Sequence, residues 1–207
     1  MRALGVLLVA LCLGGCSASR HAARSLPFYD DPELTPVWEE QSISPHQVSG
    51  FRLTDQTGAS VSEETLAGKI HVASFLFTSC HKVCPAMVGN LLRVQSAYAD
   101  DPQVVLVSFS VTPAIDSVPV LARYARDKGI RAERWRLLTG DREQIYSLAR
   151  ESYFADSKLD RSPDTLLHSE TVLLVDSGRR IRGVYNATLP LDVTRLIEDI
   201  ALLKAAG

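Results

Sequence analysis

From residue 50 onward, hydrophobic and polar positions alternate in blocks that predict strands and helices in turn. The runs at 70–77 and 104–110 are apolar throughout, which is typical of buried strands. Strands are predicted at 51–54, 59–61, 70–77, 104–110, 135–138, 171–176 and 181–185. Helices are predicted over Met87–Tyr98, over about 117–128, from a capping box of Asp141 and Gln144, and over Val193–Ile200.

Strands that alternate with helices and then close in a hairpin across Ser177 and Gly178 predict an α/β fold, a mixed sheet flanked by helices. The order of these elements resembles a thioredoxin-like fold. Compared with that fold, the chain has an added amino-terminal β-hairpin at about 51–61 and a polar central insertion at 156–164.

The first residues differ from the rest of the chain. Arg2 followed by a short apolar run is typical of an export signal, and residues 13–17 resemble a bacterial lipobox. We therefore expect a signal peptide at 1–15 and lipid on Cys16, with an ordinary secretory signal as the alternative. Residues 16–48 are rich in proline and predict a tether, and residues 49–207 form the folded domain.

These features predict an exported lipoprotein, anchored in a membrane and facing the periplasm or the outer face of the cytoplasmic membrane. The chain has 207 residues, of which 46% are apolar, enough for a sizeable core. Its formal charge of −2, without a basic block, gives no reason to expect a nucleic-acid partner.

Two cysteines remain for chemistry in the exported domain. Cys12 lies in the leader and Cys16 would be lipidated, which leaves Cys80 and Cys84. A disulfide between them would close a very short loop and so would stabilise the fold little. They follow a buried strand and open a helix, a position that favours thiolates, and Lys82 adds a positive charge beside them.

The spacing of the two cysteines permits two chemistries. On a regular helix, their Cβ atoms would lie roughly 5–6 Å apart. A disulfide needs about 3.8 Å, so the pair could oxidise only if Cys80 lies in the turn before the helix. Two sulfurs that share a metal ion are easier to accommodate. The spacing therefore favours chelation and leaves thiol–disulfide exchange open.

A third ligand could come from His168, directly before the strand at 171–176. In a thioredoxin-like sheet this loop faces the cysteine helix. Taken alone, however, the histidine is better explained by hydrogen bonds within the loop.

The segment Phe77–Pro85, His168 and the turn at 176–178 together resemble the Sco (SenC) family of membrane-tethered copper proteins, which serve assembly of cytochrome c oxidase. The resemblance extends from about residue 49 to 203. It implies that Cys80, Cys84 and His168 bind copper as Cu(I), Cu(II) or both. It also implies a membrane anchor and a partner that is a copper-receiving oxidase subunit or another copper chaperone.

Some residues depart from the family pattern. His81 and Lys82 stand where a proline and often an acidic residue are usual, and Thr112 replaces an acidic residue. His81 is a spare ligand or, more in keeping with its helix turn, a solvent-exposed residue. Asp116 retains the family's acid; it could position the site, although a cap on the helix from 117 explains it better.

The leading hypothesis is a metallochaperone that delivers copper to a respiratory oxidase subunit, or prepares its insertion, without catalytic turnover. The alternative is a thiol–disulfide reductase that keeps a partner's metal-binding cysteines reduced. A sensor of copper or redox state is a third hypothesis. Loss of copper retention on His168→Ala, with dithiol cycling intact, would favour the first.

Overall fold

The computed structural model describes residues 25–38, 45–155 and 170–206. In chain order its elements are β1 (Phe28–Tyr29), β2 (Pro36–Val37), β3 (Arg52–Asp55), β4 (Ser60–Ser62), α1 (Glu63–Leu66), β5 (Ile70–Leu76), α2 (Val83–Ala97), β6 (Val104–Ser110), α3 (Val118–Lys128), β7 (Trp135–Thr139), α4 (Arg142–Ser147), a π-helical turn (Leu148–Ser152), β8 (Thr171–Val175), β9 (Ile181–Asn186) and α5 (Pro190–Ala206).

Strands β3 to β9 form a mixed sheet in the order β4-β3-β7-β6-β5-β8-β9. The three central strands β5, β6 and β7 are parallel, and the others pair antiparallel. All residues of β5 and β6 are buried, as expected for central strands covered on both faces. The predicted α/β class, with a mixed sheet in a thioredoxin-like arrangement, is confirmed.

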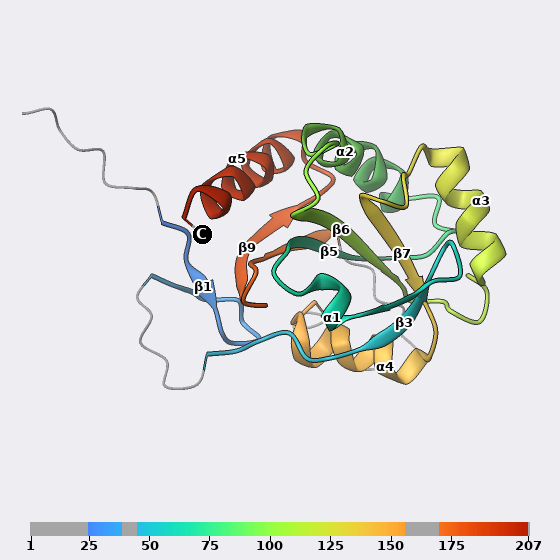
Figure 1. The fold of residues 1–207 in the computed structure, drawn as a ribbon, viewed down its shortest axis with the longest axis horizontal. Coiled ribbons are helices and arrows are strands. Elements are labelled where there is room, and N and C mark those ends of the chain that lie inside the picture. Colours follow the sequence, from blue (N-terminus) through green and yellow to red (C-terminus); the bar gives the residue numbers. More distant parts are fainter. Residues whose placement is uncertain (1–24, 39–44, 156–169, 207) are drawn as a thin grey trace, which may run out of the picture.

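Helices cover both faces of the sheet and so create two cores. Figure 1 shows α2, α3 and α5 over one face and α4 over the other. Alternate strand residues divide between them: Val72 and Leu106 pack with the first group of helices. Phe75 and Phe109 point the opposite way and pack with α4 and the π-helical turn. The period-two alternation is thus what fixes each strand between two helical layers.

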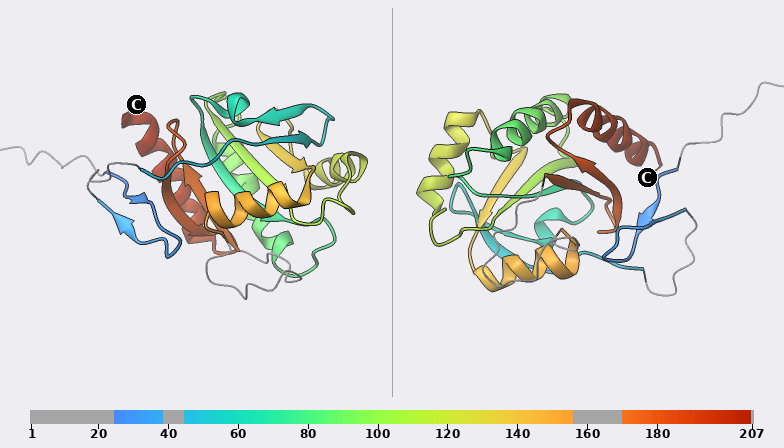
Figure 2. Two further views of the ribbon diagram at one scale, coloured as in Figure 1. Left: turned by 90° about the horizontal axis from the view of Figure 1, so that it is seen from below. Right: turned by 180° about the vertical axis from the view of Figure 1, so that it is seen from behind.

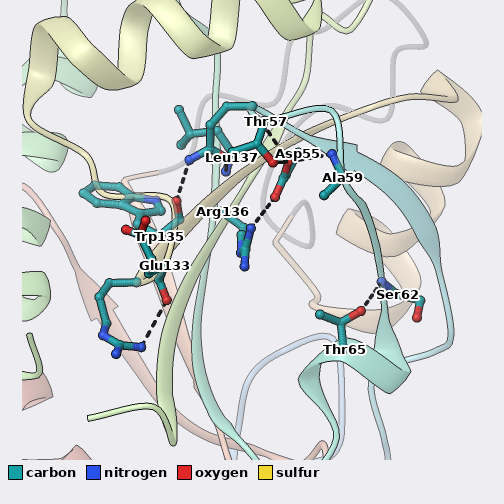
Figure 3. A network of polar contacts seen from close by, with 11 residues as sticks. Asp55, Thr57, Ala59, Ser62, Thr65, Glu133, Trp135, Arg136 and Leu137 are labelled. Atoms are coloured by element: carbon teal, nitrogen blue, oxygen red, sulfur yellow. Dashed lines mark hydrogen bonds and ion pairs between the residues drawn. The ribbon is translucent and has the colours of Figure 1, made fainter. Parts of the chain in front are cut away.

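The predicted amino-terminal hairpin is β3–β4, and it is fastened to β7 by polar contacts (Figure 3). The Asp55 carboxylate accepts hydrogen bonds from the backbone of Thr57 and Ala59, at 2.8 and 3.0 Å. Its other oxygen pairs with Arg136 of β7 at 2.5 Å. One buried carboxylate therefore closes the turn and joins the added hairpin to the sheet.

The predicted end of α3 and start of α4 are close to the observed ones. Gly129 ends α3 in the left-handed conformation, with φ of 74°. Asp141 caps α4 by accepting from the Gln144 amide at 2.8 Å. The reciprocal half of the capping box is wrong, because the Gln144 side chain instead accepts from the Arg52 amide. The predicted central insertion at 156–164 lies outside the described residues.

The predicted tether differs from the structure at residues 25–38. These residues form the β1–β2 hairpin, which packs against β9 (Figure 2). Leu26 is buried in the core, and Arg182 of β9 donates to the carbonyls of Pro27 and Leu26 at 3.0 and 2.7 Å. The Phe28 ring lies between Arg180 and Arg182, whose guanidinium carbons are 3.7 and 3.9 Å from its centroid. The proline-rich composition of this segment therefore gave no indication of the short hairpin that packs against the sheet.

Candidate metal centre

The two cysteines sit at the junction of β5 and α2. Cys80 lies in the loop before the helix, where its amide donates to the Phe77 carbonyl at 3.2 Å. Cys84 is in the first turn of α2, whose amino-terminal cap is Lys82. Both side chains are buried, and both thiols are free. Cys80 therefore occupies the position before the helix that oxidation of this spacing requires.

The surroundings of the two thiols give them opposite properties. Burial alone would raise the pKa of Cys80, but hydrogen bonds from the Cys84 thiol and from the amides of Cys84, Lys82 and Val83 lower it. Burial, and then the neighbouring Cys80 sulfur, raises the pKa of Cys84 to about 12. Cys80 is thus the more readily ionised sulfur, and Cys84 retains its proton. Lys82 acts here through its backbone N–H.

A buried carboxylate holds the loop that precedes Cys80. Asp116 is fully buried and accepts hydrogen bonds from the Thr78 amide at 3.2 Å and from the Thr78 hydroxyl at 2.5 Å. It also accepts from the hydroxyls of Ser110 and Thr112, at 2.6 and 3.0 Å. The end of β6 and the cysteine loop are therefore joined through one side chain.

The expectation that Asp116 caps α3 is wrong. The cap position belongs to Ser117, and the Asp116 carboxylate instead bonds to the thiol loop. Sequence reasoning missed Thr78 and Ser110 as its partners. A signal was available, because both residues lie where neighbouring parallel strands end, and such ends meet at one edge of a sheet.

Strand β8 begins at this same edge of the sheet. β8 runs antiparallel to β5 with Ala73 opposite Leu173, so its first residue lies near the end of β5. The Glu170 carbonyl accepts from the Ala187 amide at 2.8 Å. The Ala187 carbonyl in turn accepts from Asn90 of α2 at 2.9 Å. Residue 170 is thereby connected to the helix that carries Cys84.

The structure brings together some of the predicted site residues. Cys80 and Cys84 are adjacent, Asp116 fixes their loop, and His81 is exposed to solvent, as expected from its place in the turn. Cys16 and His168 lie outside the described residues. Within 25–38, 45–155 and 170–206, no group of three or more His, Cys, Asp or Glu residues could hold a metal ion.

The donor set fits a soft metal ion. Two cysteine sulfurs, one of them with a lowered pKa, are the ligands that Cu(I) prefers. The same two thiols, one more readily ionised than the other, also suit thiol–disulfide exchange. No helix in the described part of the chain is both long and apolar enough to cross a membrane.

The chain is similar to known proteins in both sequence and structure. The sequence profile of the SCO1/SenC family matches residues 39–204. The structure of a SCO1/SenC family lipoprotein from Bacillus anthracis is 27% identical, with a TM-score of 0.68, over 77% of this chain and 95% of that one. BsSco, a member of the Sco family of cytochrome c oxidase assembly proteins with a disulfide switch, is 26% identical with a TM-score of 0.67, over 78% and 95%. Copper-bound ScoI of Arabidopsis thaliana is 25% identical with a TM-score of 0.59, over 76% and 98%.

Proposed function

This chain belongs to the SCO1/SenC family, and we propose that it binds copper and serves the assembly of cytochrome c oxidase. The observation that carries the proposal is the pair of buried thiols, Cys80 and Cys84, held at the end of β5 by hydrogen bonds. The chain is similar over most of its length to a family member whose structure contains copper.

We propose Cys80, Cys84 and His168 as the copper ligands. Two thiolates and one imidazole suit copper in either oxidation state. The start of β8 at the thiol edge of the sheet supports a ligand from the residues just before it. Three protein ligands leave a position open, through which a receiving site could take the ion by ligand exchange. The receiver would be an oxidase subunit or another copper chaperone.

We propose that lipid on Cys16 anchors the chain to a membrane, facing the periplasm or the outer face of the cytoplasmic membrane. A similar protein from Bacillus anthracis is a lipoprotein. Leu26 is buried in the core, so the lipid on Cys16 would lie close to the domain along the chain. Replacing Cys16 with serine should release the protein from the membrane fraction.

A second candidate function is thiol–disulfide exchange with a partner's metal-binding cysteines. The position of Cys80 before the helix, with its lowered pKa, favours it, because an attacking sulfur must be ionised and able to reach a second sulfur. The two functions are compatible, since a copper site in the partner must be reduced before it is filled.

The deciding experiment measures copper bound per reduced chain, with Cys16 replaced by serine to keep the protein unlipidated. We expect about one copper per chain from the single ligand set. It should be lost when Cys80 and Cys84 become serine, and held more weakly after His168→Ala. His81→Ala is the matched control, because His81 is exposed and adjoins Cys80.

No retained copper, together with a measurable dithiol potential, would reject the copper function in favour of the reductase. Unchanged copper affinity in His168→Ala would reject the three-ligand set alone.

A further inference from the structure

A cavity of about 180 Å³ lies between the β1–β2 hairpin, β9 and α5, and neither thiol lines it. The hairpin that forms one of its walls lies beside β9 (Figure 1). The cavity is smaller than the roughly 300–1,000 Å³ pockets of drug-sized ligands, so it suits a head group or a small molecule. Its lining includes the carboxylate of Asp199 and the aromatic side chains of Tyr29, Trp38 and Tyr185. A negative charge and aromatic walls are thus combined in one hollow.

Asp199 is a buried carboxylate that has no cationic partner among the described residues. It is only 8% exposed, and its one hydrogen bond there comes from the Tyr185 hydroxyl, at 2.8 Å. The two guanidinium groups that also line the cavity are engaged elsewhere. Arg195 pairs with Asp192 at 3.6 Å, and Arg182 pairs with the turn before β9 at 3.1 Å. Buried charges are usually paired, so this one indicates a site for a cation from outside the chain.

The sequence of β9 builds this wall of the cavity. Gly183 and Tyr185 are two residues apart and so lie on the same face of the strand. A Cβ atom on Gly183 would collide with the ring and the hydroxyl of Tyr185. The missing side chain therefore lets the Tyr185 ring lie over the strand and brings its hydroxyl to Asp199.

An organic cation suits these walls better than a metal ion does. One carboxylate is too few for an ion such as Ca²⁺, which takes about six to eight oxygen ligands. Over the ranges that the structure describes, no group of three or more His, Cys, Asp or Glu residues could hold a metal. Ammonium groups, in contrast, are attracted to the faces of aromatic rings. Leu26, Pro27 and Pro36 also line the cavity and offer apolar contact to N-methyl groups.

We propose that this cavity binds a quaternary ammonium group of the choline type, through the Asp199 carboxylate and the rings of Tyr29 and Trp38. The group would belong to a free small molecule or to a lipid head group. Binding changes no covalent bond and involves neither thiol, so the inference is independent of the proposed copper function.

The test measures binding of choline to the full chain with Cys16 replaced by serine, by equilibrium dialysis. A neutral analogue, in which carbon replaces the choline nitrogen, has the same shape without the charge. Asp199→Asn removes the carboxylate charge and keeps an acceptor for the Tyr185 hydroxyl. Asp127→Asn is the matched control, because it removes the same charge from an exposed position on α3. Thermal unfolding shows whether each variant keeps its fold.

We expect the wild type to bind choline and not the neutral analogue. Asp199→Asn should bind choline at least about tenfold more weakly, as for loss of a contact with a charged group. Trp38→Ala, at a position that is 64% exposed, should bind about threefold more weakly, and Asp127→Asn should match the wild type.

Three results would overturn the inference: no binding by the wild type, equal binding of choline and its neutral analogue, or equal losses in Asp199→Asn and Asp127→Asn. Binding that appears only after Arg195→Gln would also overturn it, because the chain's own guanidinium would then fill the cavity.

Vesicles distinguish the two sources of the cation. Sedimentation of the unlipidated chain with phosphatidylcholine vesicles, but not with phosphatidylglycerol vesicles, would support a lipid head group if Asp199→Asn abolished it. Choline binding without such sedimentation would support a free ammonium compound.

Discussion

Asp116 shows how a single side chain can hold the cysteine loop in place. Its carboxylate satisfies four donors at the ends of β5 and β6, so removing it leaves those donors unpaired in the interior. We expect Asp116→Ala to lower the free energy of unfolding by about 2–4 kcal/mol. We also expect weaker Cu(I) retention, because Thr78 lies two residues before Cys80. Urea unfolding and chelator competition measure the two effects.

A helix cap provides the control for Asp116. Asp141 accepts one hydrogen bond from Gln144 at the start of α4, away from the thiols. Asp141→Ala should cost about 1 kcal/mol of stability and leave copper retention unchanged. If Asp116→Ala lost stability but kept full affinity for copper, its carboxylate would be structural only.

His71 predicts how stability depends on pH. It is fully buried in β5, its Nε2 lies 3.1 Å from the Tyr153 hydroxyl, and burial lowers its pKa from 6.5 to about 4. The unfolded chain therefore binds a proton at a higher pH than the folded one. Stability from this residue is fully present above about pH 6.5 and falls as the pH drops toward 4, by about 3 kcal/mol in all.

His71→Phe tests this prediction by urea unfolding between pH 8 and 4. The variant should be less stable at pH 8, because Tyr153 loses its partner, by about 1–2 kcal/mol. Its stability should then fall less steeply with acid than that of the wild type. His81→Gln, a change at an exposed histidine, should keep the wild-type slope. A parallel decline in His71→Phe and wild type would contradict a buried neutral histidine.

At the scale of elements, apolar runs and glycines predicted most of the architecture. The runs at 70–77 and 104–110 became β5 and β6, two of the three central strands, because continuous apolar runs of that length favour buried strands over helices. The β1–β2 hairpin did not follow from the sequence. Its strands have two residues each, too few for any periodicity, and a cation–π contact from Arg182 of β9 to Phe28 helps to hold it.

That hairpin is expected to contribute to stability. Phe28→Ala removes a ring held between two guanidinium groups and should lower the free energy of unfolding by about 2–3 kcal/mol. Trp38→Ala is the control at the same end of the chain, because Trp38 is 64% exposed, and it should change stability by less than about 0.5 kcal/mol. Thermal or urea unfolding measures both changes. If Phe28→Ala changed stability as little as Trp38→Ala, the hairpin would not be part of the cooperative unit.

At the scale of the whole molecule, the sequence pointed to candidate residues for the chemistry but not to the contacts that hold them in place. Cys80 and Cys84 stood out through their place between a buried strand and a helix. The bonds from Asp116 to Thr78, which is 38 residues away along the chain, require instead that β5 and β6 become neighbours, and spacing along the chain does not encode that.

The proposed ligands come from two distant segments, so copper should stabilise the whole domain. An ion that binds only the folded chain adds stability as its free concentration exceeds its dissociation constant, by about 4 kcal/mol at roughly a thousandfold excess. We expect buffered Cu(I) to raise the unfolding free energy of the reduced wild type by that order. The rise should be smaller in His168→Ala and absent when Cys80 and Cys84 are serine. Equal stabilisation of the double-serine protein would place the copper elsewhere, whereas no stabilisation of the wild type would mean that the folded state offers no preferential site.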